Sequence, residues 1–323
     1  MQTIVGVLRG GVSKEHEVSL RSGAAILANL SEERYLARDI YIDKNGQWHY
    51  RGRVTAPERV LRQLDVAILP LHGEYGESGE VQQLLERFGV PYVGANAFGC
   101  HHAMHKVIAK ARAREEGLLT PEFRYAEHLE ESEAVAHDIV RNFHQPVVVK
   151  PVGWGSSVGV SIASGYVEVL AAIEELFAQG ATGVFVEELI RGKEATAGVV
   201  EGLRGEALYA LPPIEIIPPP DAGFFSADVK YTGETREVCP GNFSRVETEE
   251  LQRMAKVMHR ALHQRHYSRS DFIVTPKGIY FLETNSAAAV GLTPQSLLPK
   301  SLAAIGVSFK DFLSHLVNLA LGR

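Results

Sequence analysis

The chain has 323 residues, of which 45% are hydrophobic and 22% are charged, with a formal net charge of −6 and a pI near 6.1. This composition is typical of a folded protein with two or three domains. The negative charge and the lack of a basic run argue against a nucleic-acid-binding protein. Its two cysteines, Cys100 and Cys239, form neither a ligand pair nor a disulfide framework, and no apolar run approaches the ~20 residues that cross a bilayer. The N-terminus also lacks the apolar region of a signal peptide, so we expect a cytoplasmic protein with no membrane partner.

Residues 1–98 are predicted to form a doubly wound α/β domain. An apolar strand at 3–8 ends in Gly10-Gly11, and a helical pattern follows it. Further apolar runs predict strands at 38–43, 66–71 and 91–94, with a helix at 79–88. The glycines do not follow the GxGxxG pattern, so a dinucleotide site is not expected.

Two polar, glycine-bearing segments, 10–17 and 71–77, follow strands of this domain. Ligands of such sheets collect beyond the carboxyl ends of the strands. Glu15 in the first segment would there hold a substrate amine. A solvated loop explains both segments as well, and on these residues alone it is the favoured interpretation.

Residues 99–186 are predicted to form a second unit. It begins with a basic helix at 103–116 that carries Lys106 and Lys110, and a polar helix follows at 130–142. A strand ending in Lys150 then leads into a glycine- and serine-rich loop at 153–159 and a return strand. Backbone amides, hydroxyls and a lysine in this order favour phosphate binding, although a simple hairpin turn is an equal alternative. The pattern is not the Walker loop, because a strand and not a helix follows it.

Residues 187–323 are predicted to form a third unit. It follows an apolar strand that runs into acids at 184–190, a pattern that suits an adenine edge and a ribose or, equally, a domain hinge. A proline-dense segment at 212–220 and a long aperiodic segment at 223–239 come next, and the latter is a candidate lid. An amphipathic helix is predicted at 247–263, a loop at 286–299 and a closing helix at 309–321.

Between those helices, residues 269–285 predict a β-hairpin with a three-residue loop at Pro276-Lys277-Gly278. That loop would set Asp271 opposite Glu283 and Arg269 opposite Asn285, with all four side chains on one face. Cross-strand neighbours lie ~5 Å apart, so the two carboxylates would repel each other without a cation. Their oxygen ligands favour Mg²⁺, and Arg269 would suit a bridging phosphate. An exposed face neutralised by Arg269 and solvent explains the pattern equally well.

Six motifs in order over the whole chain resemble the D-alanine–D-alanine ligase family of ATP-grasp enzymes. They are Gly10-Gly11 with Glu15-His16-Glu17-Val18-Ser19-Leu20, Leu71-His72-Gly73, Val149-Lys150-Pro151 with Gly155-Ser156-Ser157-Val158-Gly159, Leu211-Pro212-Pro213-Ile214-Glu215-Ile216, Lys230-Tyr231 with Cys239-Pro240, and Glu283-Thr284-Asn285. The resemblance implies a three-domain fold of mixed α/β class, in which two antiparallel sheets clasp ATP. It also implies a homodimer.

The same resemblance implies roles for individual residues, grouped by what they would contact. The ATP phosphates would contact Lys106, Lys150, Ser156 and Lys230. The adenine would contact Glu187, Glu188 and Ile190, and the ribose would contact Glu194. Two Mg²⁺ ions, for which Mn²⁺ could substitute, would be bound by Asp271, Glu283 and Asn285. Glu15 would hold the ammonium of the first D-alanine near His72, and Ser296 and Leu297 would line the site of the second. Glu15, Ser156 and Tyr231 would link the first substrate to the lid, and Arg269 with the backbone amide near Gly291 would stabilise the oxyanion.

The chain also departs from the family pattern. The usual Pro-Gly-Met-Thr after the metal ligands is replaced by a longer loop without proline, from Ser286 to Thr293. Trp154 stands where an acid is frequent, and His105 replaces an aspartate before Lys106. The changed loop leaves a ligase with a different second substrate as the main alternative, and a decayed nucleotide-binding protein as a lesser one. Tyr231 favours D-alanine over D-lactate.

Overall fold

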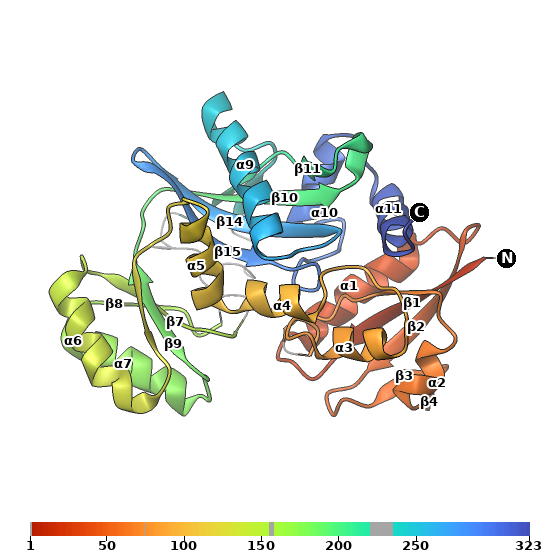
Figure 1. Ribbon diagram of the computed structural model, residues 1–323, viewed down its shortest axis with the longest axis horizontal. Coiled ribbons are helices and arrows are strands. Elements are labelled where there is room, and N and C mark those ends of the chain that lie inside the picture. The colour runs from red at the N-terminus through yellow and green to blue at the C-terminus, as the bar shows by residue number, and fades with distance from the viewer. Residues whose placement is uncertain (1, 74, 155–157, 220–234) are drawn as a thin grey trace.

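The computed structural model describes residues 2–73, 75–154, 158–219 and 235–323. Three β-sheets follow one another along the chain, and helices pack between and around them (Figure 1). Every helix in these ranges is too short or too polar to span a lipid bilayer.

The first sheet has the order β4-β3-β2-β1-β5, and its strands β2, β1 and β5 run parallel. Its strands are β1 (Thr3–Gly10), β2 (Tyr35–Ile42), β3 (Trp48–Tyr50), β4 (Arg53–Val54) and β5 (Val66–Ile68). Val5 and Val7 point into a core with helix α1 (His16–Asn29), while Leu8 points to the opposite core with α2 (Pro57–Leu61) and α3 (Glu80–Arg87). Helices therefore cover both faces, as the doubly wound prediction required.

The strand predicted at 91–94 is wrong, because this segment contributes an isolated bridge between Ala67 and Tyr92. The single helix predicted at 103–116 is also wrong. Two helices occupy the region, α4 (Ala97–Met104) and α5 (Lys106–Glu115), and the chain turns between them at His105, whose φ is −81° and ψ 97°.

The second sheet is antiparallel, with the order β6-β9-β7-β8. Its elements are β6 (Phe123–Ala126), the 3₁₀ turn η1 (Leu129–Glu131), α6 (Ser132–Asn142), β7 (Val147–Pro151), β8 (Ser161–Ala163), α7 (Gly165–Ala178) and β9 (Val184–Glu188). Helix α7 has no counterpart among the predicted elements, although Val169, Ile173 and Leu176 recur at helical spacing and are buried. A division of the chain at 186/187 falls inside β9, so Glu187 and Glu188 belong to this sheet.

The third sheet has the order β13-β12-β10-β14-β15, with β11 beside β10. Its elements are β10 (Lys193–Glu201), η2 (Leu203–Gly205), β11 (Leu208–Ala210), β12 (Ile214–Ile217), β13 (Arg236–Val238), α9 (Arg245–Ala261), β14 (Tyr267–Thr275) and β15 (Gly278–Asn285). Helices α9 and α5 cover one face, where Ala109 and Ala113 share a core with Phe281. Helix α5 therefore packs on the third sheet, although its sequence precedes the second.

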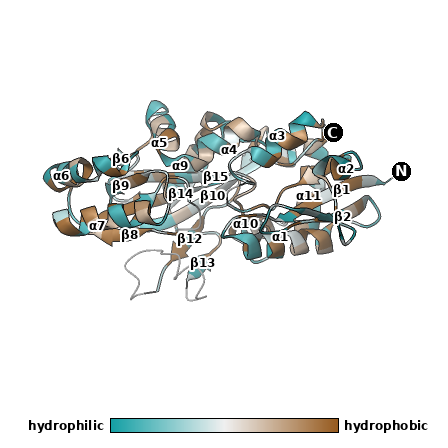
Figure 2. Cartoon of the chain, turned by 90° about the horizontal axis from the view of Figure 1, so that it is seen from below, coloured by the Kyte–Doolittle hydropathy of each residue, from teal (hydrophilic) through white to brown (hydrophobic). Residues whose placement is uncertain are grey.

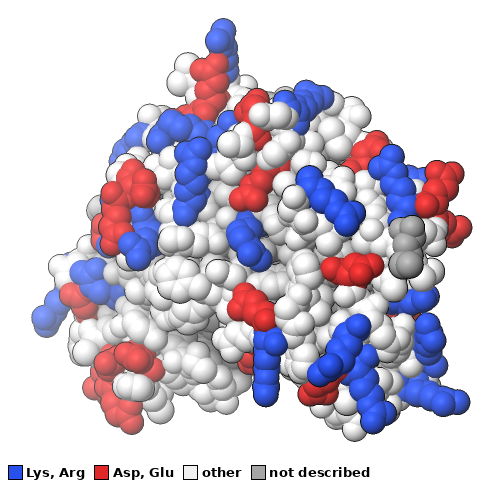
Figure 3. Space-filling view, turned by 45° about the vertical axis from the view of Figure 1, so that its right-hand side comes forward, with Lys and Arg blue, Asp and Glu red and all other residues white. Residues whose placement is uncertain are grey.

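The last two helices, α10 (Leu297–Ala304) and α11 (Phe309–Ala320), return towards the first sheet. Phe312 and Leu316 share a core with Val5 and Ile26, and α11 lies beside α1 in Figure 1. Hydrophobic residues gather on the packed sides of α7 and α11 (Figure 2). On the face drawn in Figure 3 acidic and basic side chains are interspersed.

Candidate active site

A cavity of about 220 Å³ lies between the second and third sheets, and the first domain closes one end. Strand β7 and the end of β9 line one side, and β10, β14 and β15 line the other. Glu15 and Glu77 reach it from the first domain, Lys106 from α5 and Leu297 from α10. Most of the predicted residues in the described ranges thus meet in one place, whereas His72, Gly291 and Ser296 do not line the cavity.

The hairpin that forms one wall is β14 and β15. Its loop has two residues, not the predicted three, because Thr275 pairs with Gly278. A β-bulge between Asp271 and Phe272 shifts the register by one residue. The bulge compensates for the shorter loop, so Asp271 faces Glu283 and Arg269 faces Asn285, as predicted.

Asp271 is held by three neighbours. The hydroxyl of Thr196 donates to its Oδ1 at 2.5 Å, the amide of Asn285 donates to Oδ2 at 2.9 Å, and Arg269 forms an ion pair at 3.0 Å. These contacts fix the orientation of the carboxylate before any ligand binds. Thr196 on β10 was missed by sequence reasoning, because nothing local indicates that it neighbours Asp271.

Glu283 differs from Asp271, because its carboxylate has no hydrogen-bond or ion-pair partner among the described residues. Two facing carboxylates and an amide oxygen form a donor set that suits a hard divalent cation. Within the described ranges no three His, Cys, Asp or Glu side chains form a metal-sized cluster. The remaining ligands of a cation here would therefore be oxygens of other groups, such as phosphate and water.

Three buried lysines, Lys106, Lys110 and Lys150, line or approach the cavity from the opposite side. Glu187 lies between two of them, 2.7 Å from Lys110 Nζ and in a short ion pair with Lys150. Burial opposes ionisation of Glu187, but the two ammonium groups outweigh burial, and the pKa of Glu187 lies below its usual value. Burial lowers the pKa of Lys110 to about 8.

Glu187 lines the cavity, as its predicted contact with adenine requires. Its carboxylate pairs with Lys110 and Lys150, and it thereby fixes the position of the Lys150 ammonium at the wall of the cavity. Lys110 was not predicted as a site residue, although it follows Lys106 by one helical turn on the same face.

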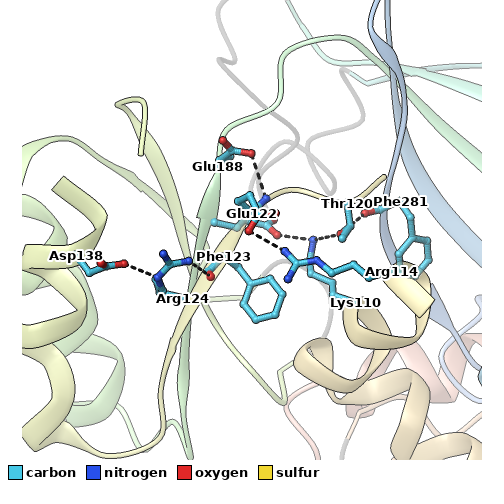
Figure 4. Close-up of polar contacts among 10 residues, drawn as sticks. Lys110, Arg114, Thr120, Glu122, Phe123, Arg124, Asp138, Glu188 and Phe281 are labelled. Atoms are coloured by element: carbon cyan, nitrogen blue, oxygen red, sulfur yellow. Dashed lines mark hydrogen bonds and ion pairs between the residues drawn. The ribbon is translucent and has the colours of Figure 1, made fainter. Parts of the chain in front are cut away.

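Figure 4 shows how the segment between α5 and β6 joins the second and third sheets. Lys110 donates to the hydroxyl of Thr120 at 2.9 Å, and this hydroxyl donates to the Phe281 carbonyl on β15 at 3.0 Å. The Glu188 carboxylate accepts a hydrogen bond from the backbone amide of Glu122 at 3.1 Å. Its side chain is therefore also turned towards the protein, although Glu188 lines the cavity together with Ile190 and Glu194.

Lys106 connects α5 to the start of the glycine-rich loop. Its ammonium donates to the carbonyls of Val152 at 3.3 Å and Trp154 at 3.0 Å. Burial lowers its pKa. Ser156 of this loop, together with Lys230 and Tyr231 of the predicted lid, lies outside the described residues.

At the end formed by the first domain, Glu15 lies close to Gly73, where an added Cβ would come within 3.1 Å of its carboxylate oxygen. The hydroxyl of Ser13 donates to the His72 carbonyl at 2.6 Å and accepts from the Glu15 amide at 3.1 Å. The ring of His72 is buried and contacts Ser22 Oγ at 3.1 Å. His72 thus neighbours Glu15 through its backbone, as predicted, while its ring contacts α1.

Glu77 is a buried acid of this site that sequence reasoning did not single out. Its Oε1 accepts a hydrogen bond from the Gly73 amide at 2.6 Å. Burial and then the nearby charge of Glu15 raise its pKa to about 7. Two acids that approach one another inside a cavity favour a cation between them.

The residues predicted around the second substrate gather at the N-terminus of α10. Leu297 lines the cavity, and Ser296 Oγ accepts from the Thr293 amide at 3.1 Å. An added Cβ on Gly291 would lie 2.9 Å from that hydroxyl, so the loop passes close to Ser296. The longer loop is firmly packed, since the amides of Ala289 and Val290 bond the Ser286 carbonyl at 2.9 and 3.1 Å.

The comparisons with known proteins agree along the whole chain. Residues 114–318 match the family described as "D-ala D-ala ligase C-terminus", and residues 4–59 and 51–95 match "D-ala D-ala ligase N-terminus". A D-alanine–D-alanine ligase of Syntrophobacter fumaroxidans is 37% identical over 98% of this chain and 97% of its own length.

Solved structures resemble the fold over the same extent. The VanG D-Ala:D-Ser ligase from Enterococcus faecalis superposes with a TM-score of 0.86 at 28% identity, covering 99% of this chain and 100% of that chain. A D-alanine–D-alanine ligase from Bacillus anthracis complexed with ATP gives a TM-score of 0.80 at 29% identity, covering 99% and 98%.

Proposed function

Because the chain belongs to the D-alanine–D-alanine ligase family, we propose that it joins two D-alanine molecules with hydrolysis of ATP to ADP and phosphate. The product, D-alanyl-D-alanine, serves the synthesis of peptidoglycan precursors. The observation that carries the proposal is the cavity in which buried lysines face the paired carboxylates of Asp271 and Glu283. Such a site suits a nucleotide triphosphate and a divalent cation.

ATP would lie between the second and third sheets. Apolar side chains on both sides of the cavity, among them Val148 and Ile216, would enclose the adenine, and the chain at Glu188 to Ile190 would meet its edge. Glu194 would contact the ribose. Lys106 and Lys150, with Ser156 and Lys230, would bind the phosphates.

Asp271, Glu283 and Asn285 would hold two Mg²⁺, with Mn²⁺ as a substitute. Bound there, the ions would neutralise charge on the phosphate oxygens during transfer. Arg269 already pairs with Asp271, so its guanidinium would remain next to that charge.

In the first step the carboxylate of one D-alanine attacks the γ-phosphorus, the bond to the β-phosphate oxygen breaks, and an acyl phosphate and ADP form. Glu15 would hold the substrate ammonium and orient the carboxylate, with Ser156 and Tyr231 completing the contact. An acyl phosphate reacts with water, so the lid predicted at 223–239 would cover it, apart from residues 236–238, which form strand β13.

In the second step the amine of another D-alanine attacks the acyl carbon, phosphate leaves, and the amine gives up its proton. Ser296 and Leu297 at the start of α10 would bind the carboxylate of this D-alanine, where free backbone amides favour an anion. Arg269 and the Gly291 amide would stabilise the oxyanion, a contact typically worth about 3–4 kcal/mol.

A second candidate differs only in the acceptor. The similarity to a D-Ala:D-Ser ligase and the altered loop from Ser286 to Thr293 favour a comparison with D-serine. Phosphate release from Mg·ATP is therefore to be measured with D-alanine, D-serine, D-lactate or L-alanine alone and with D-alanine paired with each of the others, with products identified by mass. We expect release and D-alanyl-D-alanine with D-alanine alone. A mixed dipeptide with D-serine would move the assignment to the second candidate, and no release with any of them would overturn both.

The proposal includes a homodimer in the cytoplasm, where ATP is available. Light scattering of the purified protein tests the dimer, for which a mass near twice 35.4 kDa is expected.

A further inference from the structure

We propose that Lys14 and Trp154 form a clamp that positions the amine-binding loop of the first domain against the glycine-rich loop. The inference rests on the proposed function and concerns the site of the first D-alanine. The ammonium nitrogen of Lys14 lies 4.5 Å from the centroid of the Trp154 ring, which is the geometry of a cation–π contact. The two residues come from different domains and are 140 positions apart in the sequence, a separation obtained from their numbers (154 − 14).

Trp154 is anchored in the second domain. Its ring packs against the core of that domain, and an added Cβ on Gly159 would lie 3.2 Å from two ring atoms. Its carbonyl accepts a hydrogen bond from Lys106 at 3.0 Å. The tryptophan therefore sits at a fixed place at the entrance to the glycine-rich loop, and its side chain lines the cavity.

Lys14 is exposed, but its backbone belongs to an ordered turn of the first domain. Its neighbour Ser13 bonds both the His72 carbonyl at 2.6 Å and the Glu15 amide at 3.1 Å. Lys14 and Glu15 thus belong to one short, hydrogen-bonded turn. A contact that fixes Lys14 relative to Trp154 also fixes the Glu15 carboxylate relative to the phosphate-binding loop.

The clamp joins the two groups that the first step must bring together. Glu15 would hold the ammonium of D-alanine, and the glycine-rich loop would hold the γ-phosphate that its carboxylate attacks. D-alanine would be held at both ends, by Glu15 at its ammonium and beside the phosphate at its carboxylate, so an error in this distance weakens its binding. Lys14 and Trp154 are therefore positioning residues, and neither touches the reacting atoms.

The test is a double-mutant cycle on the kinetics of phosphate release. We expect Lys14→Met and Trp154→Leu each to raise the KM of the first D-alanine about two- to fivefold, as befits an exposed cation–π contact, with kcat within twofold. The double variant should be no worse than either single variant. Lys14→Arg and Trp154→Phe should restore most of the KM, since both preserve the contact. If the two effects multiply in the double variant, the residues act independently and the clamp is wrong.

Fluorescence tests the contact without any turnover. The chain has two tryptophans, so Trp48→Phe leaves Trp154 as the only one. In that background Lys14→Met should change the emission of Trp154, whereas the control Lys44→Met, at an exposed lysine of the same domain, should not. Unchanged emission would overturn the clamp even if ligation occurs. If Lys14→Met changes the emission but the protein ligates no amino acid, the proposed function is overturned and the contact stands. If the emission changes but the effects of the two substitutions on KM are not coupled in the double-mutant cycle, the positioning role is overturned.

Discussion

At the scale of single residues, the acids of the site differ sharply in what their carboxylates contact. Glu187 is locked between two lysines, Asp271 is held by three donors, and Glu283 has no partner among the described residues. The same residue type therefore serves structure in one place and ligand binding in another.

Glu187→Gln is expected to destabilise the fold by about 3 kcal/mol, because two buried ammonium groups lose their counter-charge. Urea unfolding measures the loss. The matched control is Glu188→Gln, on the neighbouring residue whose carboxylate accepts one backbone hydrogen bond, and its effect should be below about 1 kcal/mol. Equal effects at both positions would contradict the role given to Glu187.

Glu77 should make stability depend on pH. Its pKa in the folded protein is raised to about 7, above the usual 4.5, so the folded protein binds its proton more tightly than the unfolded chain does. Stability is therefore lost as pH rises from about 4.5 to 7, by up to about 3 kcal/mol. Urea unfolding at pH 5 and pH 8 should show this fall in the native protein and a smaller fall in Glu77→Gln. Parallel profiles for the two proteins would refute the assignment.

At the scale of elements, the hairpin of β14 and β15 carries two acids, Asp271 and Glu283, whose substitution should affect stability and turnover differently. Glu283→Gln removes a carboxylate without a hydrogen bond or ion pair among the described residues, whose charge favours the ammonium form of Lys106 but opposes ionisation of Glu77. Its melting temperature should therefore change little, while Mg²⁺-dependent turnover falls at least about 100-fold. Asp271→Asn should lose both, because Arg269 loses its ion pair. Thermal melts and phosphate-release assays on the two variants decide this, and a destabilised Glu283→Gln protein would speak against it.

The same hairpin shows what the sequence could and could not predict. The facing of Asp271 and Glu283 was predicted correctly from a loop that was one residue too long, because the bulge cancelled the error. Bulges arise from packing between strands and leave no clear local signal. The ion pairs of Glu187 were missed for a related reason, since an acid at the end of an apolar strand does not reveal which side chains of a distant helix will face it.

The residues missed by sequence reasoning were those that become part of the site only through contacts with distant parts of the chain. Thr196 and Glu77 become site residues only when β10 meets β14 and the first domain meets α5. In contrast, α7 and Lys110 carried a helical spacing that was readable in advance. Linear motifs with a fixed order, such as those around Lys150 and Asn285, were the most informative part of the sequence.

At the scale of the whole molecule, the first domain meets the third at a joint where the side chains of Arg265 and His266 bond the backbone of Gly94. Arg265 donates to the Gly94 carbonyl at 3.1 and 3.0 Å, and the Gly94 amide donates to Nδ1 of His266 at 3.0 Å. His266 must be neutral to accept that hydrogen bond, and burial together with the charge of Arg265 lowers its pKa to about 4.

This joint should weaken in mild acid. Because the folded pKa of His266 lies below the usual 6.5, the unfolded chain binds its proton first, and stability is lost as pH falls from about 6.5 to 4. The loss is up to about 3 kcal/mol. Thermal melts between pH 4 and 7 should show a smaller loss in His266→Asn than in the native protein. If the melting temperature of His266→Asn falls with pH as steeply as that of the native protein, groups other than His266 cause the acid sensitivity.

The packing of α11 against the first sheet also has a consequence for how the protein is made. The core that contains Val5 and Ile26 is completed by Phe312 and Leu316, which are synthesised long after the N-terminal domain. While the rest of the chain is being synthesised, the N-terminal domain exposes an apolar face that nothing in its own sequence covers. Chaperones that shield nascent chains are therefore expected to engage this domain until α11 has been synthesised, and a chain terminated before Phe309 should be degraded rather than accumulate.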